Sequence, residues 1–238
     1  AFNIFSIPMF FSSYDEYRAV RAKLEPVLKQ KLEAKGLTFL NWGDSGWVYL
    51  FSKTAVPNVD TLKKQRLYTS AGEDAFVQLY KQNGFNPRPL PFTEIQSALM
   101  TGLLDTVPST PLATLAFQWY RNVPEMLDLG AGPLAGATVI DSKVWNSISE
   151  ADRAQVLAIA KKTQDALDRD VPAQDAQARA EMVKRGLKVT TPDATAAKGF
   201  RDMADRFAVS MKGGVVPADI YDLALRERDA YRKAHPAK

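Results

Sequence analysis

One segment, residues 91–111 (PFTEIQSALMTGLLDTVPSTP), constrains the fold of this chain more than any other. Ile95, Leu99 and Leu103 recur every four residues, which predicts a helix with one apolar face. A Thr-x-x-Gln sequence at its start has the spacing of a capping box. Gly102 lies where such a helix is expected to end. The segment therefore predicts a short helix with defined ends.

A short strand and a proline-bounded loop are expected directly after this helix. Residues 103–105 (LLD) are predicted to form a buried strand, and Pro108 and Pro111 end any regular structure beyond it. In open α/β sheets, ligands bind in the crevice at the carboxyl ends of the strands. We therefore expect residues 105–111 to contribute to a ligand-binding site.

Short strands and helices alternate along the rest of the chain, and this alternation predicts an α/β fold. Pro26 is expected to kink or break the first helix. A second capping-box spacing, Ser147-x-x-Glu150, accompanies the start of a later helix. The predicted strands cover residues 1–11, 37–40, 47–51, 66–70, 137–144 and a segment that starts at Val189. The predicted helices cover residues 14–34, 75–83, 113–119, 145–168, 175–185, 194–211 and 218–234.

The composition is that of an ordinary globular protein. The chain has 238 residues, of which 46% are hydrophobic and 24% charged, and this length suits two small domains or one large one. No apolar run approaches the roughly 20 residues that a membrane-spanning helix needs. Residues 1–11 are apolar but lack a basic lead and contain Pro8, so we interpret them as interior structure and not as a signal peptide.

The charged and reactive side chains exclude several classes of function. The net charge of +4 is spread along the chain, without the basic stripe and interleaved aromatic residues of a nucleic-acid-binding protein. The chain has no cysteine, and its single histidine, His235, lies near the end. We therefore expect no nucleic-acid partner, no metal and no cofactor. Carboxylate chemistry by Asp44 and Asp105 is the catalytic alternative, although no activated nucleophile accompanies them.

The central segment also resembles a known family. Ala98-Leu99-x-x-Gly102-x-x-Asp105, followed by a polar loop that ends in Pro111, is similar to the core motif of the DctP family, the solute receptors of TRAP-type transporters. Neighbouring segments extend the resemblance over nearly the whole chain. It implies a two-lobed, periplasmic-binding-protein-like α/β fold with a central ligand cleft, and reversible binding of a small molecule in place of catalysis. It also implies a periplasmic location and a membrane transporter component as partner, and it indicates no particular oligomeric state.

The resemblance further implies how the chain divides into lobes. Lobe 1 is predicted to comprise residues 1–53 and 135–176, and lobe 2 residues 54–134 and 177–238, with crossings at 53–54 and 134–136. Several β-α units that the family places before residue 1 have no counterpart here. We therefore expect the first lobe to be incomplete and its sheet to show an exposed edge, or to be completed by another chain.

Two basic residues that hold a ligand carboxylate in the family have no basic counterpart at the aligned positions. An arginine suits that role because its planar fork pairs with both carboxylate oxygens. The alignment places Tyr68 and Val48 at these positions. Arg66 lies two residues before Tyr68, on the same face of the predicted strand, and is an alternative clamp. Ser109 and Thr110 align with polar residues that contact ligands in the family.

Aromatic side chains are frequent in the segments that contain these two positions and in the other segments that border the cleft of the family. The residues that fall in segments bordering the cleft of the family are Trp42, Trp47, Tyr49, Phe51, Tyr68, Phe92 and Trp119. Alternation places Trp47, Tyr49 and Phe51 on one strand face, which either lines the cleft or packs in the core. Asp44 is either a ligand acceptor or a turn residue, and Asp105 is either an acceptor or a cap or loop anchor.

These substitutions predict the chemistry of the ligand. A dicarboxylate would enter with at least one charge unpaired, so we expect a neutral or largely apolar small organic molecule. The candidate ligand-binding residues are Trp42, Asp44, Trp47, Tyr49, Arg66, Tyr68, Phe92, Ser109, Thr110 and Trp119. Two alternatives stay open: a periplasmic carrier of a lipid or sterol-like molecule for another transport machine, and a carboxylate-dependent hydrolase.

Overall fold

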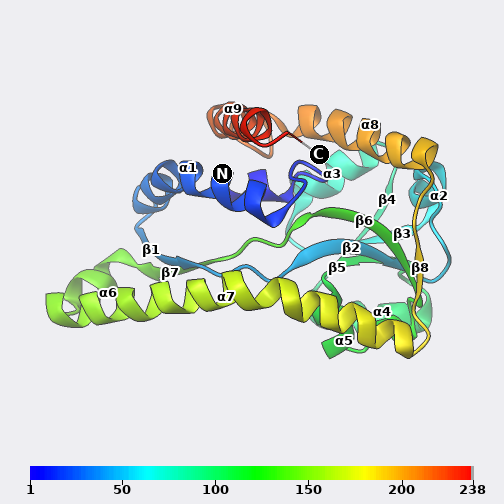
Figure 1. The fold of residues 1–238 in the computed structure, drawn as a ribbon, viewed down its shortest axis with the longest axis horizontal. Helices are drawn as coiled ribbons and strands as arrows, with labels where there is room; N and C mark the ends of the chain where they lie inside the picture. Colours follow the sequence, from blue (N-terminus) through cyan, green and yellow to red (C-terminus); the bar gives the residue numbers. More distant parts are fainter. Residues whose placement is uncertain (237–238) are drawn as a thin grey trace.

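A computed structural model describes residues 1–236 and shows two β-sheets surrounded by helices (Figure 1). The strands are β1 (Leu37–Trp42), β2 (Trp47–Ser52), β3 (Arg66–Ser70), β4 (Asn86–Leu90), β5 (Thr106–Ser109), β6 (Glu125–Pro133), β7 (Ala137–Asp141) and β8 (Lys188–Thr190). The α-helices are α1 (Tyr14–Glu33), α2 (Val59–Lys64), α3 (Asp74–Gln82), α4 (Ile95–Thr101), α5 (Pro111–Ala116), α6 (Ser142–Ser147), α7 (Glu150–Lys184), α8 (Ala194–Met211) and α9 (Ala218–Ala234). Short 3-10 helices are η1 (Phe2–Ser6), η2 (Phe92–Glu94) and η3 (Trp119–Arg121).

The larger sheet has six strands in the order β4-β3-β5-β2-β6-β8. β3 is parallel to β4 and β5, and β6 is parallel to β8. β2 is antiparallel to both of its neighbours, β5 and β6. Five strands therefore run in one direction, and their carboxyl ends share one edge of the sheet with the start of β2. We call this the carboxyl edge.

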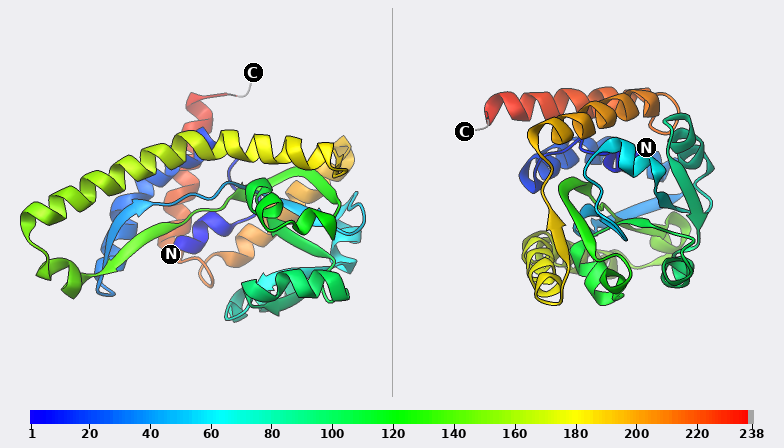
Figure 2. Two further views of the ribbon diagram at one scale, coloured as in Figure 1. Left: turned by 90° about the horizontal axis from the view of Figure 1, so that it is seen from below. Right: turned by 90° about the vertical axis from the view of Figure 1, so that its right-hand side faces the viewer.

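Helices cover both faces of the six-stranded sheet (Figures 1 and 2). On one face, a core that includes Phe51, Leu99 and Met182 joins β2 to α4 and the end of α7. On the other face, Leu67 and Phe200 join β3 to α8, with α2 and α3 beside them. Sheets covered on both faces need apolar residues on both sides of their strands, as this sheet has.

The smaller sheet is an antiparallel ribbon of β1 and β7. The largest apolar core lies beside it and contains residues of η1, α1 and α9, with Tyr17, Leu24 and Trp42 almost fully buried. The chain passes between the ribbon and the six-stranded sheet at residues 43–46 and 134–136. These two passages are hydrogen-bonded to each other, for example from the Gly43 amide to the Gly136 carbonyl at 2.8 Å.

α7 connects the two parts of the molecule. It packs on β1 with its first half and on α5 with its second half, so it runs along the whole length of the protein (Figure 1). Sequence patterns predicted two helices, 145–168 and 175–185, where the structure has this single one. Pro172 lies in the predicted gap, and a proline in a helix removes one hydrogen bond without always ending the helix.

Several other predicted elements were wrong in detail. Residues 1–11 contain η1 and no strand, because a short apolar run does not distinguish strand from helix. Both capping boxes are absent: α4 has no side-chain cap, and α7 is capped by Ser149, whose hydroxyl accepts from the Asp152 amide. α1, α8 and α9 lie within one residue of their predicted bounds.

For residues 91–111, the predicted helix and strand occur in the expected order, but the strand lies further along the chain than predicted. Gly102 ends α4 in the left-handed conformation (φ 78°), as predicted. The strand that follows, β5, begins at Thr106, and not at the predicted 103–105. Asp105 consequently lies at the amino end of β5, while Thr110 and Pro111 follow its carboxyl end. Only the last part of the predicted 105–111 loop therefore reaches the carboxyl edge.

The predicted lobe boundaries are close to the passages between the sheets and stay a prediction. β2 lies wholly in the six-stranded sheet, so the first passage is at residues 43–46, ahead of 53–54. The second passage coincides with 134–136. Residues 237–238 of the predicted second lobe lie outside the described residues. None of the helices in residues 1–236 combines the length and apolar character that crossing a membrane would require.

Candidate functional site

The carboxyl edge of the six-stranded sheet brings together several residues that the sequence singled out. Thr110 is buried and caps α5, because its side-chain oxygen accepts from the Ala113 amide at 3.3 Å. Ser109 pairs in register with Tyr49 of β2 and donates to the Thr110 carbonyl at 3.3 Å. Trp47 begins β2 at the same edge. Both hydroxyls thus have local backbone partners, and they hold the start of α5 against β2.

An acid that sequence reasoning missed fixes this edge from α7. Asp175 is buried and accepts from the Trp47 amide at 2.8 Å, the Leu112 amide at 3.0 Å and the Tyr14 hydroxyl at 3.5 Å. Burial raises the pKa of Asp175, and the two amide donors oppose that rise. The signal for this residue in the sequence is an acid in a buried helical stripe, with Ala178 three residues later.

Two glycines permit this close packing. Gly46 has φ +114°, and a side chain there would collide with the Asp175 carboxylate. A side chain at Gly130 of β6 would collide with the indole ring of Trp47. The Trp47 ring also packs edge-on against Tyr14, with 5.0 Å between ring centroids. The edge is therefore a dense junction of α1, β2, β6 and α7.

A second polar cluster lies next to Tyr49 on the face covered by α7. Arg179 of α7 donates to Asp128 of β6 at 2.7 Å, and about a third of each side chain is exposed. This hydrogen bond raises the pKa of Arg179. Burial raises the pKa of Tyr49, and the positive charge of Arg179 opposes that rise. The cluster supplies a partly exposed cation close to β2 that the sequence did not indicate.

The two positions at which the family has basic residues hold half-buried neutral side chains. Tyr68 lies in the middle of β3 and packs at the border of the apolar core, with its hydroxyl 3.5 Å from the Ser70 hydroxyl. Val48 lies opposite Gly132 in the β2–β6 pair. The exposed Arg88 is the register partner of Tyr68 on the neighbouring parallel strand, so the two side chains share one face.

Arg66, the predicted alternative clamp, is engaged elsewhere. Its guanidinium donates to both carboxylate oxygens of Asp105, at 2.7 and 2.6 Å, and its backbone amide donates at 3.1 Å. These bonds lower the pKa of Asp105. Both residues lie at the amino ends of their strands, across the sheet from the carboxyl edge. Asp105 is thus an anchor between β3 and β5, the second of the two roles predicted for it.

Asp44 is an internal partner of the passage between the sheets. It accepts from the Tyr17 hydroxyl at 2.8 Å and from the Arg21 guanidinium at 2.5 Å, and it is buried. Asp44 precedes β2, whereas the Asp105 carbonyl accepts from the amide of Lys53, which follows β2. The two acids lie at opposite ends of a six-residue strand, about 20 Å long. They do not share a cleft, which contradicts a hydrolase built on this pair.

The predicted aromatic residues divide into two groups. Phe51 is fully buried, and Trp42, Trp47 and Trp119 are nearly so, hence these rings are core in the described structure. Tyr49 and Tyr68 are half-buried, and Phe92 is 53% exposed. The Phe92 ring forms a cluster with Phe117 and Trp119, at centroid distances of 5.1 to 5.5 Å. Of the predicted aromatic residues, the partly exposed ones are therefore Tyr49, Tyr68 and Phe92, with the exposed Phe117 beside Phe92.

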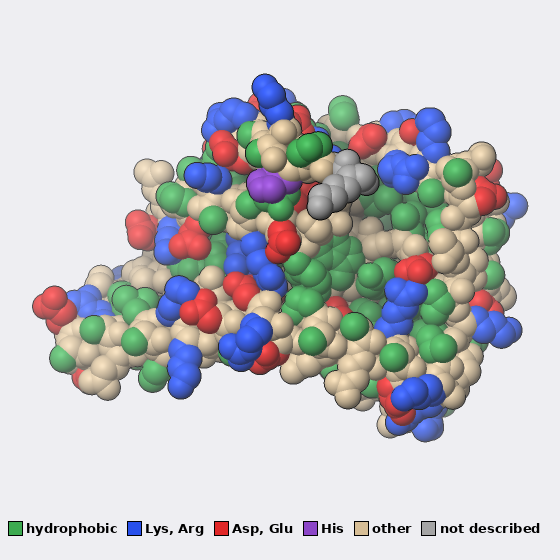
Figure 3. All heavy atoms as spheres, viewed as in Figure 1, with side chains coloured by type: hydrophobic (Ala, Val, Ile, Leu, Met, Phe, Trp, Pro, Cys, Tyr) green, Lys and Arg blue, Asp and Glu red, His purple; other side chains and the backbone are tan. Residues whose placement is uncertain are grey.

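An open groove lies beside the carboxyl edge. It runs between α5 and α7, has a volume of about 310 Å³, and is lined by Leu112, Leu115, Gln174, Gln177 and Glu181 among others. Residues 1–236 contain no group of three or more His, Cys, Asp or Glu side chains placed to hold a metal ion. On the face in Figure 3, basic and acidic side chains are interspersed, without a basic stripe.

The sequence and the fold of this chain match a known protein family. A sequence profile of the family "Bacterial extracellular solute-binding protein, family 7" (DctP) matches residues 1–211, and the chain belongs to that family. The C4-dicarboxylate-binding periplasmic protein DctP of Rhodobacter capsulatus is 25% identical over 151 residues, which are 62% of this chain and 44% of that protein. The 2,3-diketo-L-gulonate-binding periplasmic protein YiaO of Escherichia coli is 29% identical over 43% of this chain and 32% of that protein. The match thus spans less than half the length of these curated relatives.

Solved structures show the same fold. A Bordetella pertussis extracytoplasmic solute receptor that binds pyroglutamic acid, DctP7, superposes with a TM-score of 0.86 at 18% identity, over 96% of this chain and 74% of that one. A TRAP periplasmic solute-binding protein from Desulfovibrio desulfuricans with bound sn-glycerol-3-phosphate gives a TM-score of 0.84 at 22% identity, over 95% and 72%. The predicted family and the two-lobed α/β fold class are confirmed.

Proposed function

We propose that this protein is the extracytoplasmic solute receptor of a TRAP-type transport system. It would bind a small organic molecule between two lobes, without catalysis, and present it to a membrane transporter component. The family match over residues 1–211 carries this proposal. The names of the relatives, which are periplasmic binding proteins, support a periplasmic location. Contacts made only in the closed form would shift the lobes towards closure.

For the ligand, we propose a neutral or largely apolar molecule. The observation that supports this is the engagement of Arg66 by Asp105, together with Val48 and Tyr68 at the two positions that are basic in the family. An unpaired buried carboxylate costs at least several kcal/mol. That cost is a large part of the roughly 8 kcal/mol of micromolar binding. Tyr49, Tyr68 and the Phe92 cluster supply apolar contact area.

The relatives define the competing ligand class. They are named for C4-dicarboxylates and 2,3-diketo-L-gulonate, and the solved neighbours contain pyroglutamic acid and glycerol phosphate. An acid would require a cation that the aligned positions lack. Arg66 and Arg88 lie on the Tyr68 face of β3 and β4, and Arg179, next to Tyr49, is paired with Asp128. No observation favours the lipid or sterol carrier.

Calorimetric titration with succinate, malate and pyroglutamate, beside a panel of neutral organic molecules, tests the ligand proposal. We expect the acids to bind with a Kd weaker than about 1 mM, which corresponds to roughly 4 kcal/mol. Three variants make the result specific: Arg66→Ala, Arg88→Ala, and Asp105→Asn, which releases Arg66. Micromolar binding of an acid that disappears in either arginine variant would overturn the neutral ligand and identify the clamp. Failure of every small molecule to bind would instead count against the receptor function.

A further inference from the structure

α7 contains a proline at a position where the helix needs a substitute hydrogen-bond donor. Pro172 lies near the middle of the 35-residue helix. Proline has no amide hydrogen, so the carbonyl four residues earlier, that of Asp168, loses its helical partner, and the proline ring pushes that carbonyl outwards. Helices bend at such positions. α7 changes direction near its middle, as the left view of Figure 2 shows.

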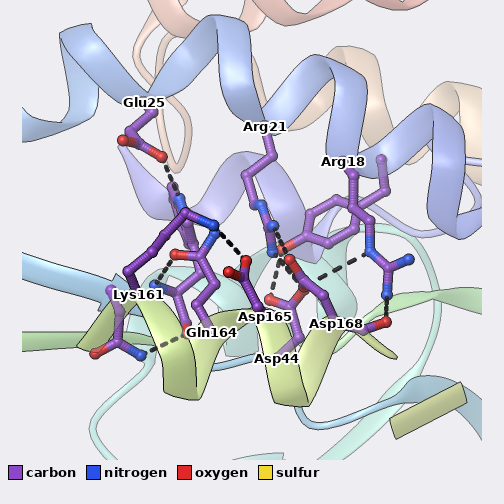
Figure 4. A network of polar contacts seen from close by, with 11 residues as sticks. Arg18, Arg21, Glu25, Asp44, Lys161, Gln164, Asp165 and Asp168 are labelled. Atoms are coloured by element: carbon purple, nitrogen blue, oxygen red, sulfur yellow. Dashed lines mark hydrogen bonds and ion pairs between the residues drawn. The ribbon is translucent and has the colours of Figure 1, made fainter. Parts of the chain in front are cut away.

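A side chain from α1 occupies this vacated position. The Arg18 guanidinium donates a hydrogen bond to the Asp168 carbonyl. The Arg18 Nε atom also lies 3.6 Å from the Asp168 carboxylate, and Arg21 donates to that carboxylate at 2.9 Å. Figure 4 shows both guanidinium groups reaching from α1 to this one turn of α7. The carbonyl that Pro172 leaves unpaired is therefore the one that Arg18 binds.

α1 also holds the helix on the other side of the proline. Tyr14 donates to Asp175 at 3.5 Å, and the Arg18 guanidinium lies 5.1 Å above the centre of the Tyr14 ring. The α1 residues that make these contacts, Tyr14, Arg18 and Arg21, are spaced by four and three, hence on one helix face. They bind residues 168 and 175, one turn before and one turn after the proline.

We propose that Arg18 is a positioning residue: it replaces, from α1, the backbone hydrogen bond that Pro172 removes from α7, and so fixes the bend of α7. Because α7 packs on the ribbon with one half and on α5 with the other, the bend sets the orientation of the β1–β7 ribbon relative to the six-stranded sheet. This inference does not depend on the proposed ligand or transport role.

The second proline inside a helix gives a contrast within the same protein. Pro26 of α1 leaves the Ala22 carbonyl without its helical donor. Both residues are exposed, so water can satisfy that carbonyl. Within residues 1–236, no side chain donates to it. Pro26→Ala is therefore a matched control: it restores a helical amide at a proline that no arginine serves.

The experiment measures the bend directly and uses the absence of cysteine in the chain. Spin labels on introduced cysteines at Ile159 of α7 and at Met100 of α4, 66% and 67% exposed, report the distance between the ribbon half and the sheet half. Ile159 is 13 residues, about 20 Å, from Pro172, so a change of about 20° in the bend displaces it by about 7 Å. A second pair, Ile159 with the exposed Lys64 of α2 on the other face of the sheet, reports displacement in another direction.

We expect Arg18→Met to shift or broaden at least one of the two distance distributions by several ångström. In a Pro172→Ala background, where the restored amide serves the Asp168 carbonyl, Arg18→Met should leave both distributions unchanged. In a Pro26→Ala background, the Arg18→Met effect should persist. The melting temperatures of the same variants give a second test. Arg18→Met should lower the melting temperature less in the Pro172→Ala background than in the wild type.

Two results would overturn the proposal. One is an Arg18→Met variant with unaltered distributions. The other is an Arg18→Met effect of the same size in the Pro172→Ala and Pro26→Ala backgrounds, since a general structural role of Arg18 would produce that outcome. If Arg18→Met does not fold, the Pro172→Ala double variant is predicted to fold, and its failure to do so would equally contradict the proposal.

Discussion

Two arginine–aspartate pairs in this protein have the same chemistry and opposite settings. In the Arg21–Asp44 pair the side chains are 5% and 3% exposed, and the pair joins α1 to the passage between the two sheets. In the Arg66–Asp105 pair they are 40% and 18% exposed, and the pair joins two strand ends at the surface. The sequence offered both aspartates as ligand acceptors. Burial and partners, and not residue type, therefore separate a structural ion pair from a chemically available one.

Removal of Asp44 should produce the largest loss of stability. Asp44→Ala takes away the carboxylate that accepts from Arg21 and Tyr17. Within residues 1–236 it leaves the buried guanidinium with Asp168 as its remaining acid partner. Breaking a buried pair from one side costs about 3–5 kcal/mol in the free energy of unfolding. Equilibrium unfolding in urea measures the loss.

A double variant sharpens this prediction. In Arg21→Met/Asp44→Leu no unpaired charge stays buried, so much of the lost stability should return. The matched control is Asp105→Ala, the same change in the exposed pair. If Asp44→Ala costs no more than Asp105→Ala, the contrast between the two pairs is wrong.

The exposed pair should contribute much less. Arg66→Ala removes a bidentate ion pair that solvent already screens. We expect the melting temperature to fall by less than about 3 °C, because exposed pairs contribute little to the stability of a domain of this size. Thermal unfolding followed by circular dichroism measures this. A fall in melting temperature comparable to that of Asp44→Ala would show that the surface pair stabilises the fold as strongly as the buried pair.

The sequence predicted the fold where local signals decide it. The helices α1, α8 and α9 follow from apolar periodicity and their terminal residues, and Gly102 ended α4 as expected. Local signals failed where tertiary contacts decide. Pro172 falls between the two helices predicted in place of α7, but α1 supports the chain across it. The family motif supplied the two-lobed class, which periodicity alone does not reach.

The binding site stays a prediction, and the structure shows where its candidate residues lie. Thr110 and Trp47 meet at the carboxyl edge because β5 and β2 are antiparallel neighbours, whereas Tyr68 lies in the middle of β3. Asp175 was missed because its backbone partners lie 128 and 63 residues away in the sequence, so no spacing rule connects them. The choice between core and cleft for the aromatic residues likewise depends on which helices cover each strand face.

The smallest expected effect is the acid dependence of the exposed pair, and its sign distinguishes the two aspartates. The hydrogen bonds from Arg66 lower the pKa of Asp105, so the folded protein holds that proton less tightly than the unfolded chain does. Asp105 therefore adds stability above its unfolded pKa of about 3.9, and this contribution is lost as the pH falls through the lowered folded value. Burial raises the pKa of Asp44 against the pull of Arg21, so the contribution of Asp44 has the opposite sign.

Urea unfolding of the wild type and of Asp105→Asn at a series of pH values isolates the contribution of Asp105 ionisation to stability, because the variant has no titrating group at that position. The stability difference should be constant above about pH 5 and should shrink as the pH falls towards 3. It should also be smaller in 1 M salt, since both side chains are partly exposed and a Debye length of about 3 Å screens the pair. A difference that grows on acidification would mean that Arg66 does not stabilise the ionised form of Asp105. Arg66 would then be available to a ligand, and the argument for a neutral ligand would lose its support.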